Sequence, residues 1–161
     1  LLLPALFIHF FALFPEPPAG VSVAREIEPG LPAVLADRDQ VLQILLNLVR
    51  NALEAMPRGG ALGISARRAP EGVAFGVADS GPGIPPEDLV RVFEPYFTTK
   101  EGGTGLGLAI ALRIAEEHGG TLEASSPAGR GTVFVLTLPA APTSPASPSA
   151  PPSRPSRTPG T

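Results

Sequence analysis

Two asparagines, Asn47 and Asn51, lie four residues apart in an otherwise apolar stretch of the chain. Residues four apart are neighbours on one face of an α-helix. A buried amide that finds no hydrogen-bonding partner destabilises a fold. The two amides therefore face solvent, are satisfied by their surroundings or hold a ligand, and the rest of the chain favours a ligand.

A second candidate begins at Asp79, which follows a predicted strand and precedes Gly81 and Gly83. A carboxylate at the end of a strand can be a buried hydrogen-bond acceptor, and glycines beside it let a ligand approach the backbone closely. The amino group of adenine is one donor from which such a carboxylate could accept. Taken alone, these residues also fit a tight turn with a capping aspartate, and that alternative stays open.

A third candidate is a glycine-rich run that opens a predicted helix. The run alternates three glycines with two spacers: Gly103, Thr104, Gly105, Leu106 and Gly107. Free N–H groups and the positive dipole end make a helix N-terminus a binding place for phosphate. No Gly-Lys-Ser/Thr follows, so this is not a Walker A motif, and it does not directly follow a strand as a dinucleotide-binding turn would.

Hydrophobic periodicity and turn residues predict the elements that position these groups. A long apolar helix is expected from about 38 to 55, with Asp37 as its N-cap and Gln40 completing a capping box. A short helix is expected near 87–92. A second long helix should run from about 104–106 to His118 and end there, because two glycines follow.

Five strands are predicted, at 21–27, 61–68, 72–78, 121–125 and 131–138. With the helices, they predict an α+β fold. It should be a two-layer α/β sandwich in which helices cover one face of a mixed, mostly antiparallel sheet.

Composition divides the 161 residues into an apolar segment with a linker (1–20), a folded domain (21–139) and a Pro/Ser/Ala-rich tail (140–161) for which disorder is expected. The apolar run 1–14 is shorter than the about 20 residues of a membrane span and lacks the basic start of a signal peptide. We expect it to pack on the domain or on a partner; the end of a truncated membrane span is the alternative.

The net charge of −3 argues against a broad basic footprint, so no nucleic-acid partner is expected. The absence of cysteine excludes disulfides and thiolate metal sites. Two histidines alone are a poor basis for a zinc site.

The three candidates, together with the run Phe-Glu-Pro-Tyr-Phe-Thr-Thr-Lys at 93–100, occur in a characteristic order. This order resembles the ATP-binding domain of sensor histidine kinases, within the superfamily shared with gyrase, Hsp90 and MutL. The four stretches look like the N, G1, F and G2 boxes of that family, and the match spans about 31–139. The Phe-Thr-Thr-Lys and Gly-Thr-Gly-Leu-Gly-Leu runs point to the histidine kinase branch, especially its nitrogen-sensor-like members.

The resemblance implies the Bergerat-type ATP-binding fold and a role for each motif residue. Asn51 matches the Mg²⁺ ligand, and an amide oxygen suits a hard cation that also takes phosphate oxygens. Asp79 matches the carboxylate that reads adenine. Lys100 would contact phosphate from a mobile lid. The remaining implied ATP contacts are Asn47 beside the phosphates, Gly81 and Gly83 at the base pocket, and Gly103, Thr104, Gly105, Leu106 and Gly107 at the phosphates.

Gyrase-like members of the superfamily carry a glutamate, the general base for water, where this chain has Asn47. An amide cannot take a proton at neutral pH, so the site should hold ATP without hydrolysing it efficiently. Glu54 lies near enough to matter but is interpreted first as a surface or ion-pair residue. Phe93 and Phe97 are interpreted as lid and core anchors.

By the same resemblance, the chain is expected to transfer the γ-phosphoryl group of ATP to a histidine on a dimerisation domain, which then serves a response regulator. Neither His9 nor His118 has the surroundings of such a phosphoacceptor. A cytoplasmic location is expected, with membrane contact of the intact protein possible. The alternatives are a nucleotide-binding module without kinase output and an anti-sigma-type serine kinase. A gyrase- or MutL-like ATPase is disfavoured by Asn47.

Overall fold

The computed structural model describes residues 19–100, 102–127 and 129–142. Its elements are β1 (Val21–Ile27), α2 (Arg38–Ala55), β2 (Gly60–Ala69), β3 (Gly72–Asp79), α3 (Pro86–Leu89), α4 (Gly107–Glu117), β4 (Thr121–Ser125) and β5 (Thr132–Pro139). The expectations for the apolar run 1–14 and for most of the tail lie outside the described residues. Within the described ranges, no helix combines the length and hydropathy that a membrane crossing requires.

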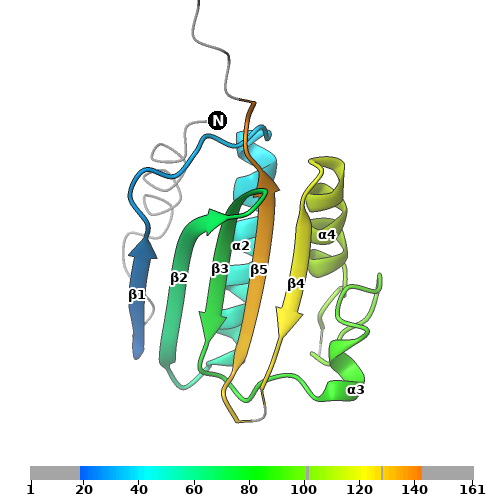
Figure 1. Ribbon diagram of the computed structural model, residues 1–161. Coiled ribbons are helices and arrows are strands. Elements are labelled where there is room, and N and C mark those ends of the chain that lie inside the picture. The colour runs from blue at the N-terminus through cyan, green and yellow to red at the C-terminus, as the bar shows by residue number, and fades with distance from the viewer. Residues whose placement is uncertain (1–18, 101, 128, 143–161) are drawn as a thin grey trace, which may run out of the picture.

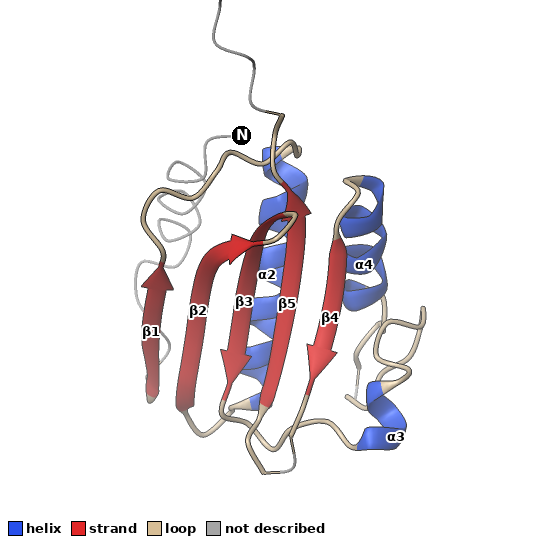
Figure 2. Ribbon diagram, in the orientation of Figure 1, coloured by secondary structure: helices blue, strands red, loops and turns tan. Residues whose placement is uncertain are grey.

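The described strands form one sheet in the order β1-β2-β3-β5-β4. β1 runs parallel to β2, and each of the other pairs is antiparallel. α2 and α4 cover the same face of this sheet (Figures 1 and 2). The predicted α+β class, with helices on one face of a mixed and mostly antiparallel sheet, is confirmed.

The core lies between this sheet and α2. Along β5, alternate side chains point into it, and Phe134, Leu136 and Leu138 are buried. The buried residues of α2 are Val41, Leu42, Ile44, Leu45, Leu48, Val49 and Ala52. Full burial of one such aliphatic side chain contributes roughly 1.5–3 kcal/mol. The packing therefore fixes the rotation of α2 about its axis, and with it the direction of the polar side chains on its remaining face.

The N-terminus of α2 is capped as predicted on one side only. The Asp37 carboxylate accepts the N–H groups of Asp39 and Gln40, at 2.9 and 3.0 Å. The predicted capping box is wrong in its second half, because the N–H of Asp37 donates to Nε2 of His118 at 3.0 Å. A residue at the end of α4 thus completes the cap of α2, which local sequence spacing could not indicate.

Both ring nitrogens of His118 have hydrogen-bonding partners. Its Nδ1 lies 2.8 Å from the carbonyl oxygen of Ile114, so Nδ1–H donates to that oxygen and Nε2 is free to accept from Asp37. The imidazole therefore links the C-terminal end of α4 to the N-terminal end of α2. The two helices run antiparallel from this tie.

Two helix boundaries differ from expectation. α4 begins at Gly107 and not at 104–106, because Gly105 has a φ of +65°, outside the right-handed helical region. α3 ends at Leu89, before the predicted 92. The chain continues there in tight turns, with the N–H of Arg91 donating to Asp88 and that of Glu94 to Arg91.

We expect His118→Ala to lower the free energy of unfolding by about 1 kcal/mol, because the Asp37 N–H loses its acceptor and the tie between α2 and α4 is removed. Urea unfolding at neutral pH measures the change. Glu116→Ala, an exposed substitution on the same turn, is the control and should change stability by less than about 0.5 kcal/mol. Equal effects of the two substitutions would contradict the role of the imidazole.

Candidate functional site

A cavity of about 630 Å³ lies between the C-terminal half of α2, the loop that follows β3 and the segment that leads into α4. Its size is in the range of small-molecule sites. The sequence segments that form it are far apart in the chain and include parts of all three candidate motifs.

Most of the predicted site residues line this cavity. They are Asn51, Asp79, Gly83, Lys100, Gly103, Thr104, Gly105 and Gly107. Asn47, Gly81 and Leu106 are not among the lining residues. The structure therefore brings most of the candidates together at one cavity, whereas Asn47, Gly81 and Leu106 are outside its lining.

Asp79, the last residue of β3, is a buried carboxylate with a side chain only 7 % exposed. Its Oδ1 accepts the N–H of Gly81 at 2.8 Å. Burial raises the pKa of the Asp79 carboxyl, and the backbone hydrogen bonds from Gly81 and Thr132 and the charge of Lys100 oppose the shift only in part. A ligand that donates a hydrogen bond to this carboxylate would relieve part of its desolvation.

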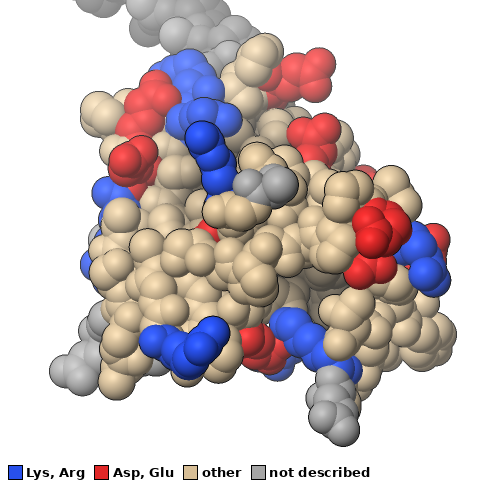
Figure 3. All heavy atoms as spheres, turned by 90° about the horizontal axis from the view of Figure 1, so that it is seen from below, with Lys and Arg blue, Asp and Glu red and all other residues tan. Residues whose placement is uncertain are grey.

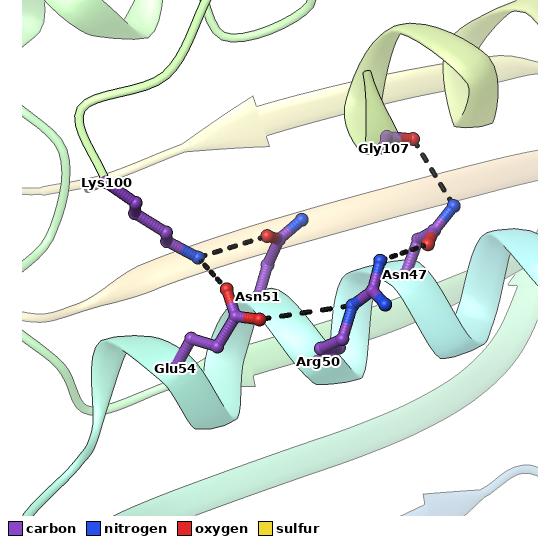
Figure 4. A network of polar contacts seen from close by, with 6 residues as sticks. All are labelled: Asn47, Arg50, Asn51, Glu54, Lys100 and Gly107. Atoms are coloured by element: carbon purple, nitrogen blue, oxygen red, sulfur yellow. Dashed lines mark hydrogen bonds and ion pairs between the residues drawn. The ribbon is translucent and has the colours of Figure 1, made fainter. Parts of the chain in front are cut away.

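Asn51 and Lys100, which both line the cavity, contact one another (Figure 4). The Lys100 ammonium donates to Oδ1 of Asn51 at 3.2 Å and to the Glu54 carboxylate at 2.5 Å. The other Glu54 oxygen lies 4.0 Å from Nε of Arg50. Four polar groups from α2 and the loop before α4 therefore form one connected network beside the cavity.

Asn47 has a different place from Asn51. Its Nδ2 donates to the carbonyl oxygen of Gly107, and its Oδ1 accepts from Arg50, each at 3.3 Å. Both ends of the amide are thus satisfied within the protein. Asn47 links α2 to the first residue of α4, so it sets where the glycine-rich run ends, and α4 begins, relative to Asn51.

The loop at 93–97 and the glycine-rich run are joined through Tyr96 and Gly105. The N–H of Tyr96 donates to the Gly105 carbonyl oxygen at 2.9 Å. A Cβ on Gly105 would overlap the backbone of Tyr96. Tyr96 itself has a φ of +67°, a left-handed conformation that costs a residue with a side chain roughly 1–2 kcal/mol. Strain of this kind is held in place by its surroundings and is typical of ligand-clamping loops.

The two phenylalanines of this loop have separate roles. Phe93 packs edge-on against Phe134 of β5, with ring centroids 6.4 Å apart, and anchors the loop to the core. Phe97 lines the cavity and lies under the Arg91 guanidinium at 4.5 Å. Phe93 is therefore a core anchor, whereas Phe97 is part of the cavity wall.

Several lining residues were not predicted from the sequence. Thr132 reaches the cavity because it is paired with Asp79 across β3 and β5, a register that only the sheet topology defines. Ile84 and Phe134 supply apolar wall. Glu54 does form ion pairs, as interpreted, but it also lines the cavity. The sequence signal that could have placed Glu54 at the cavity was its position three residues after Asn51 on the same helix.

No group of three or more His, Cys, Asp or Glu side chains suited to a metal occurs in the part of the chain that the structure describes. A metal at this site would have to combine few protein ligands with oxygens of a bound molecule, which is the usual arrangement for Mg²⁺ with phosphates.

On the face viewed from the lower end of the sheet, basic and acidic side chains stand in small separate groups (Figure 3).

Residues 36–142 match the family described as histidine kinase-, DNA gyrase B-, and HSP90-like ATPase. The chain therefore belongs to this family, and a domain of this type binds ATP.

Among curated proteins, the chain is 47 % identical over 109 residues to the sensor histidine kinase ZraS of Escherichia coli (strain K12). This match covers 68 % of the chain and 23 % of ZraS, so the chain spans about a quarter of the length of that relative.

Among solved structures, the catalytic domain of histidine kinase ThkA superposes with a TM-score of 0.77 at 36 % identity, covering 87 % of this chain and 95 % of that domain. A structure of ThkA with the response regulator TrrA matches with a TM-score of 0.73 at 32 % identity, over 86 % of this chain and 40 % of that one. The chain is thus a homologue of histidine kinase catalytic domains, and the family prediction is confirmed. The nitrogen-sensor-like subtype stays a prediction.

The raised pKa of Asp79 predicts a pH-dependent stability in the nucleotide-free protein. Between the ordinary value of 3.8 and the higher folded-state value, the folded state keeps a proton that the unfolded state has lost. The contribution of Asp79 to stability therefore falls as pH rises through this window and stays low above it. Asp79→Asn removes this fall, so the stability difference, variant minus wild type, should grow with pH through the window.

Urea unfolding across this pH range measures the difference. Asp79→Ala serves as the matched variant, because it removes the same titration while also losing the hydrogen bond to Gly81. Both variants should show the same pH slope with different absolute stabilities. A variant-minus-wild-type difference that does not change with pH would contradict the raised pKa.

Gly105→Ala should weaken ATP binding by about tenfold or more, since the added Cβ displaces the loop that carries the cavity wall and small displacements are costly for binding. Gly30→Ala is the matched control, because Gly30 also has a positive φ, does not line the cavity, and has no atom apart from its chain neighbours within 4 Å of the place that its Cβ would take. Titration calorimetry with a non-hydrolysable ATP analogue compares the two. Similar losses in both variants would show that backbone strain, and not the contact with Tyr96, determines the effect.

Proposed function

We propose that this chain is the ATP-binding catalytic domain of a two-component sensor histidine kinase. It would transfer the γ-phosphoryl group of ATP to a histidine on a dimerisation domain outside this chain. The observation that carries the proposal is the convergence of Asn51, Asp79 and the glycine-rich run on one cavity in a domain of the ATPase family. Residues 21–139 would be the folded unit, since β1 begins at Val21 and β5 ends at Pro139.

The geometry supports one orientation of the nucleotide. Asp79, buried and raised in pKa, would accept a hydrogen bond from the adenine amino group. Gly81 and Gly83 belong to the loop that follows and would shape the base pocket. The phosphates would then extend toward Gly103, Gly105 and the start of α4, where the N–H groups of the first helical turn and the helix dipole favour negative charge. Lys100 is within the same cavity and would contact phosphate.

The donor set at Asn51 fits a magnesium ion. Its amide oxygen already accepts from a cationic group, the Lys100 ammonium. Oxygen ligands are those that Mg²⁺ prefers, with phosphates completing its shell. When bound, Mg²⁺ would neutralise phosphate charge and favour transfer of the γ-phosphoryl group. Asn51 would hold it, and the protein would contribute positioning.

The environment of Asn47 supports phosphoryl transfer over hydrolysis. An amide at this position cannot act as a general base for water. Here both of its polar ends are engaged with Gly107 and Arg50. The nearby Glu54 carboxylate is engaged with Lys100 and Arg50. A site that holds ATP without activating water suits a kinase that must wait for its acceptor histidine.

The partners proposed are a histidine-containing dimerisation domain and, after it, a response regulator. ThkA has been solved with the response regulator TrrA, and ThkA resembles this chain in sequence and fold. We propose a cytoplasmic location, with the domain as the cytoplasmic part of a kinase that could be anchored in a membrane.

Incubating the chain with labelled ATP, Mg²⁺ and an isolated dimerisation domain of a related kinase tests the proposal. Acid-labile phosphate on the histidine of that domain is the expected result. ATP binding without transfer would favour a nucleotide-binding module, and acid-stable phosphate on a partner protein would favour an anti-sigma-type serine kinase.

Asn51→Ala should lower transfer by about a hundredfold or more, because a metal ion contributes several kcal/mol to stabilising charge in the transition state. Gln43→Ala, an exposed amide on the same helix that does not line the cavity, is the matched control and should transfer normally. Unchanged transfer in Asn51→Ala would show that Asn51 does not hold the metal ion.

A further inference from the structure

Lys100 and Asn51 make a contact that the ATP-bound state cannot keep. The Lys100 ammonium lies 3.2 Å from Oδ1 of Asn51, the oxygen that the proposed function gives to a metal (Figure 4). Mg²⁺ is bound by oxygen at about 2.0–2.1 Å. An ammonium and a divalent cation on one amide oxygen would be near neighbours and would repel one another strongly. Lys100 must therefore leave Asn51 when metal and nucleotide bind.

Glu54 is the group that keeps Lys100 there. Its carboxylate is 2.5 Å from the ammonium, and it lies three residues after Asn51 on the same face of α2. A charge-assisted hydrogen bond to a carboxylate is stronger than one to a neutral amide. The Asn51 contact therefore depends on the Glu54 contact more than the reverse.

The pair is suited to exchange. The Lys100 and Glu54 side chains are 42 % and 46 % exposed, so their attraction is screened by water and is weak. Arg50 lies 4.0 Å from the other Glu54 oxygen, so the carboxylate keeps a cationic neighbour when Lys100 departs. The phosphates of ATP carry more negative charge than one carboxylate and would lie in the same cavity. Lys100 can thus pass from Glu54 to phosphate at little cost.

Lys100 is the sole lysine of the chain, beside eleven arginines. Its ammonium is a compact charge on a flexible stem, which can change partners without the fixed planar geometry that guanidinium pairs favour. This residue type fits a group that alternates between two anions.

We propose that Glu54 is a positioning residue that holds Lys100 on the metal-binding amide in the nucleotide-free state and releases it to the phosphates when Mg-ATP binds. This inference rests on the proposed function. Glu54 then competes with nucleotide for Lys100, so removing the carboxylate strengthens nucleotide binding, whereas removing Lys100 weakens it.

Titration calorimetry with a non-hydrolysable ATP analogue and Mg²⁺ tests the competition in Glu54→Gln, Lys100→Met and the double variant. Glu54→Gln should bind about two- to fivefold more tightly, the range expected when a partly exposed ion pair no longer has to be broken. In the Lys100→Met background the same substitution should have no effect. Glu117→Gln removes an exposed carboxylate of the Arg113 ion pair on α4 and is the control that should leave affinity unchanged.

Tightening that persists in the Lys100→Met background would show simple charge repulsion between Glu54 and phosphate and would overturn the proposal. Weaker binding in Glu54→Gln with Mg²⁺ but not with EDTA would make Glu54 a metal ligand and would also overturn it. Unchanged affinity of Glu54→Gln for the analogue would also overturn the proposal. Loss of binding in Asp79→Asn and Asn51→Ala is the separate check on the proposed function, so the two can fail independently.

Amine labelling of Lys100 gives a second readout, since no other side chain of the protein carries a primary amine. In the absence of nucleotide, Glu54→Gln should raise the labelling rate at Lys100, measured by mass spectrometry, by about two- to fivefold, as expected for the loss of a partly exposed ion pair. Addition of the analogue with Mg²⁺ should protect Lys100 in both proteins. An unchanged rate in the nucleotide-free variant would overturn the role of Glu54.

Discussion

The antiparallel pairing of α2 with α4 is the constraint on which the site depends. α2 carries Asn51, and α4 begins where the glycine-rich run ends, so one helix–helix contact brings together the proposed metal ligand and the helix terminus proposed to bind phosphate. Two polar ties fix that contact at its ends. His118 accepts from the N-cap of α2, and Asn47 donates to the first residue of α4. A slide of one helix along the other would break both ties.

Burial makes this pairing rigid, and the polar ties make it specific. The apolar side chains of α2 select the face that meets the sheet, but small shifts of the helix along its axis would bury a similar area, because hydrophobic burial is not directional. Hydrogen bonds have narrow geometry, so the imidazole and the amide select one arrangement among those that bury similar area. Asn47 thus serves the nucleotide site by setting distances, although it does not line the cavity.

The regular parts of the fold follow from local patterns. The bounds of β1 and α2, the N-cap at Asp37 and the pairing of the two hairpins agree with periodicity and turn chemistry. What local patterns miss depends on tertiary contact. The second half of the α2 cap comes from His118, 81 residues away. Thr132 joins the cavity through sheet register, and the start of α4 moves to Gly107 because Gly105 is in a left-handed conformation.

The motif residues of the candidate site could be predicted from the sequence. The ion pair between Glu54 and Lys100 could not, because it depends on which charged side chains the fold brings close together. A carboxylate before two glycines and a glycine run at a helix start each fit several roles, and it was their order in the chain, through its resemblance to the kinase family, that predicted a common site. The partner of Glu54 could not be read from its neighbours in sequence, since Lys100 is 46 residues away. Its position decides whether Glu54 is an ordinary surface carboxylate or the counter-ion of the cavity's lysine.

The cavity combines two anionic side chains whose environments differ. Asp79 is buried and is disfavoured in its charged form until a donor reaches it, whereas Glu54 is half exposed and already paired. The first arrangement would favour the proposed adenine amino group, because such a donor would relieve part of the desolvation of the carboxylate. The second would make phosphate compete with Glu54 for the Lys100 ammonium. In the proposed mode of binding, base recognition would relieve the desolvation of Asp79, and phosphate recognition would require Lys100 to exchange one anion for another.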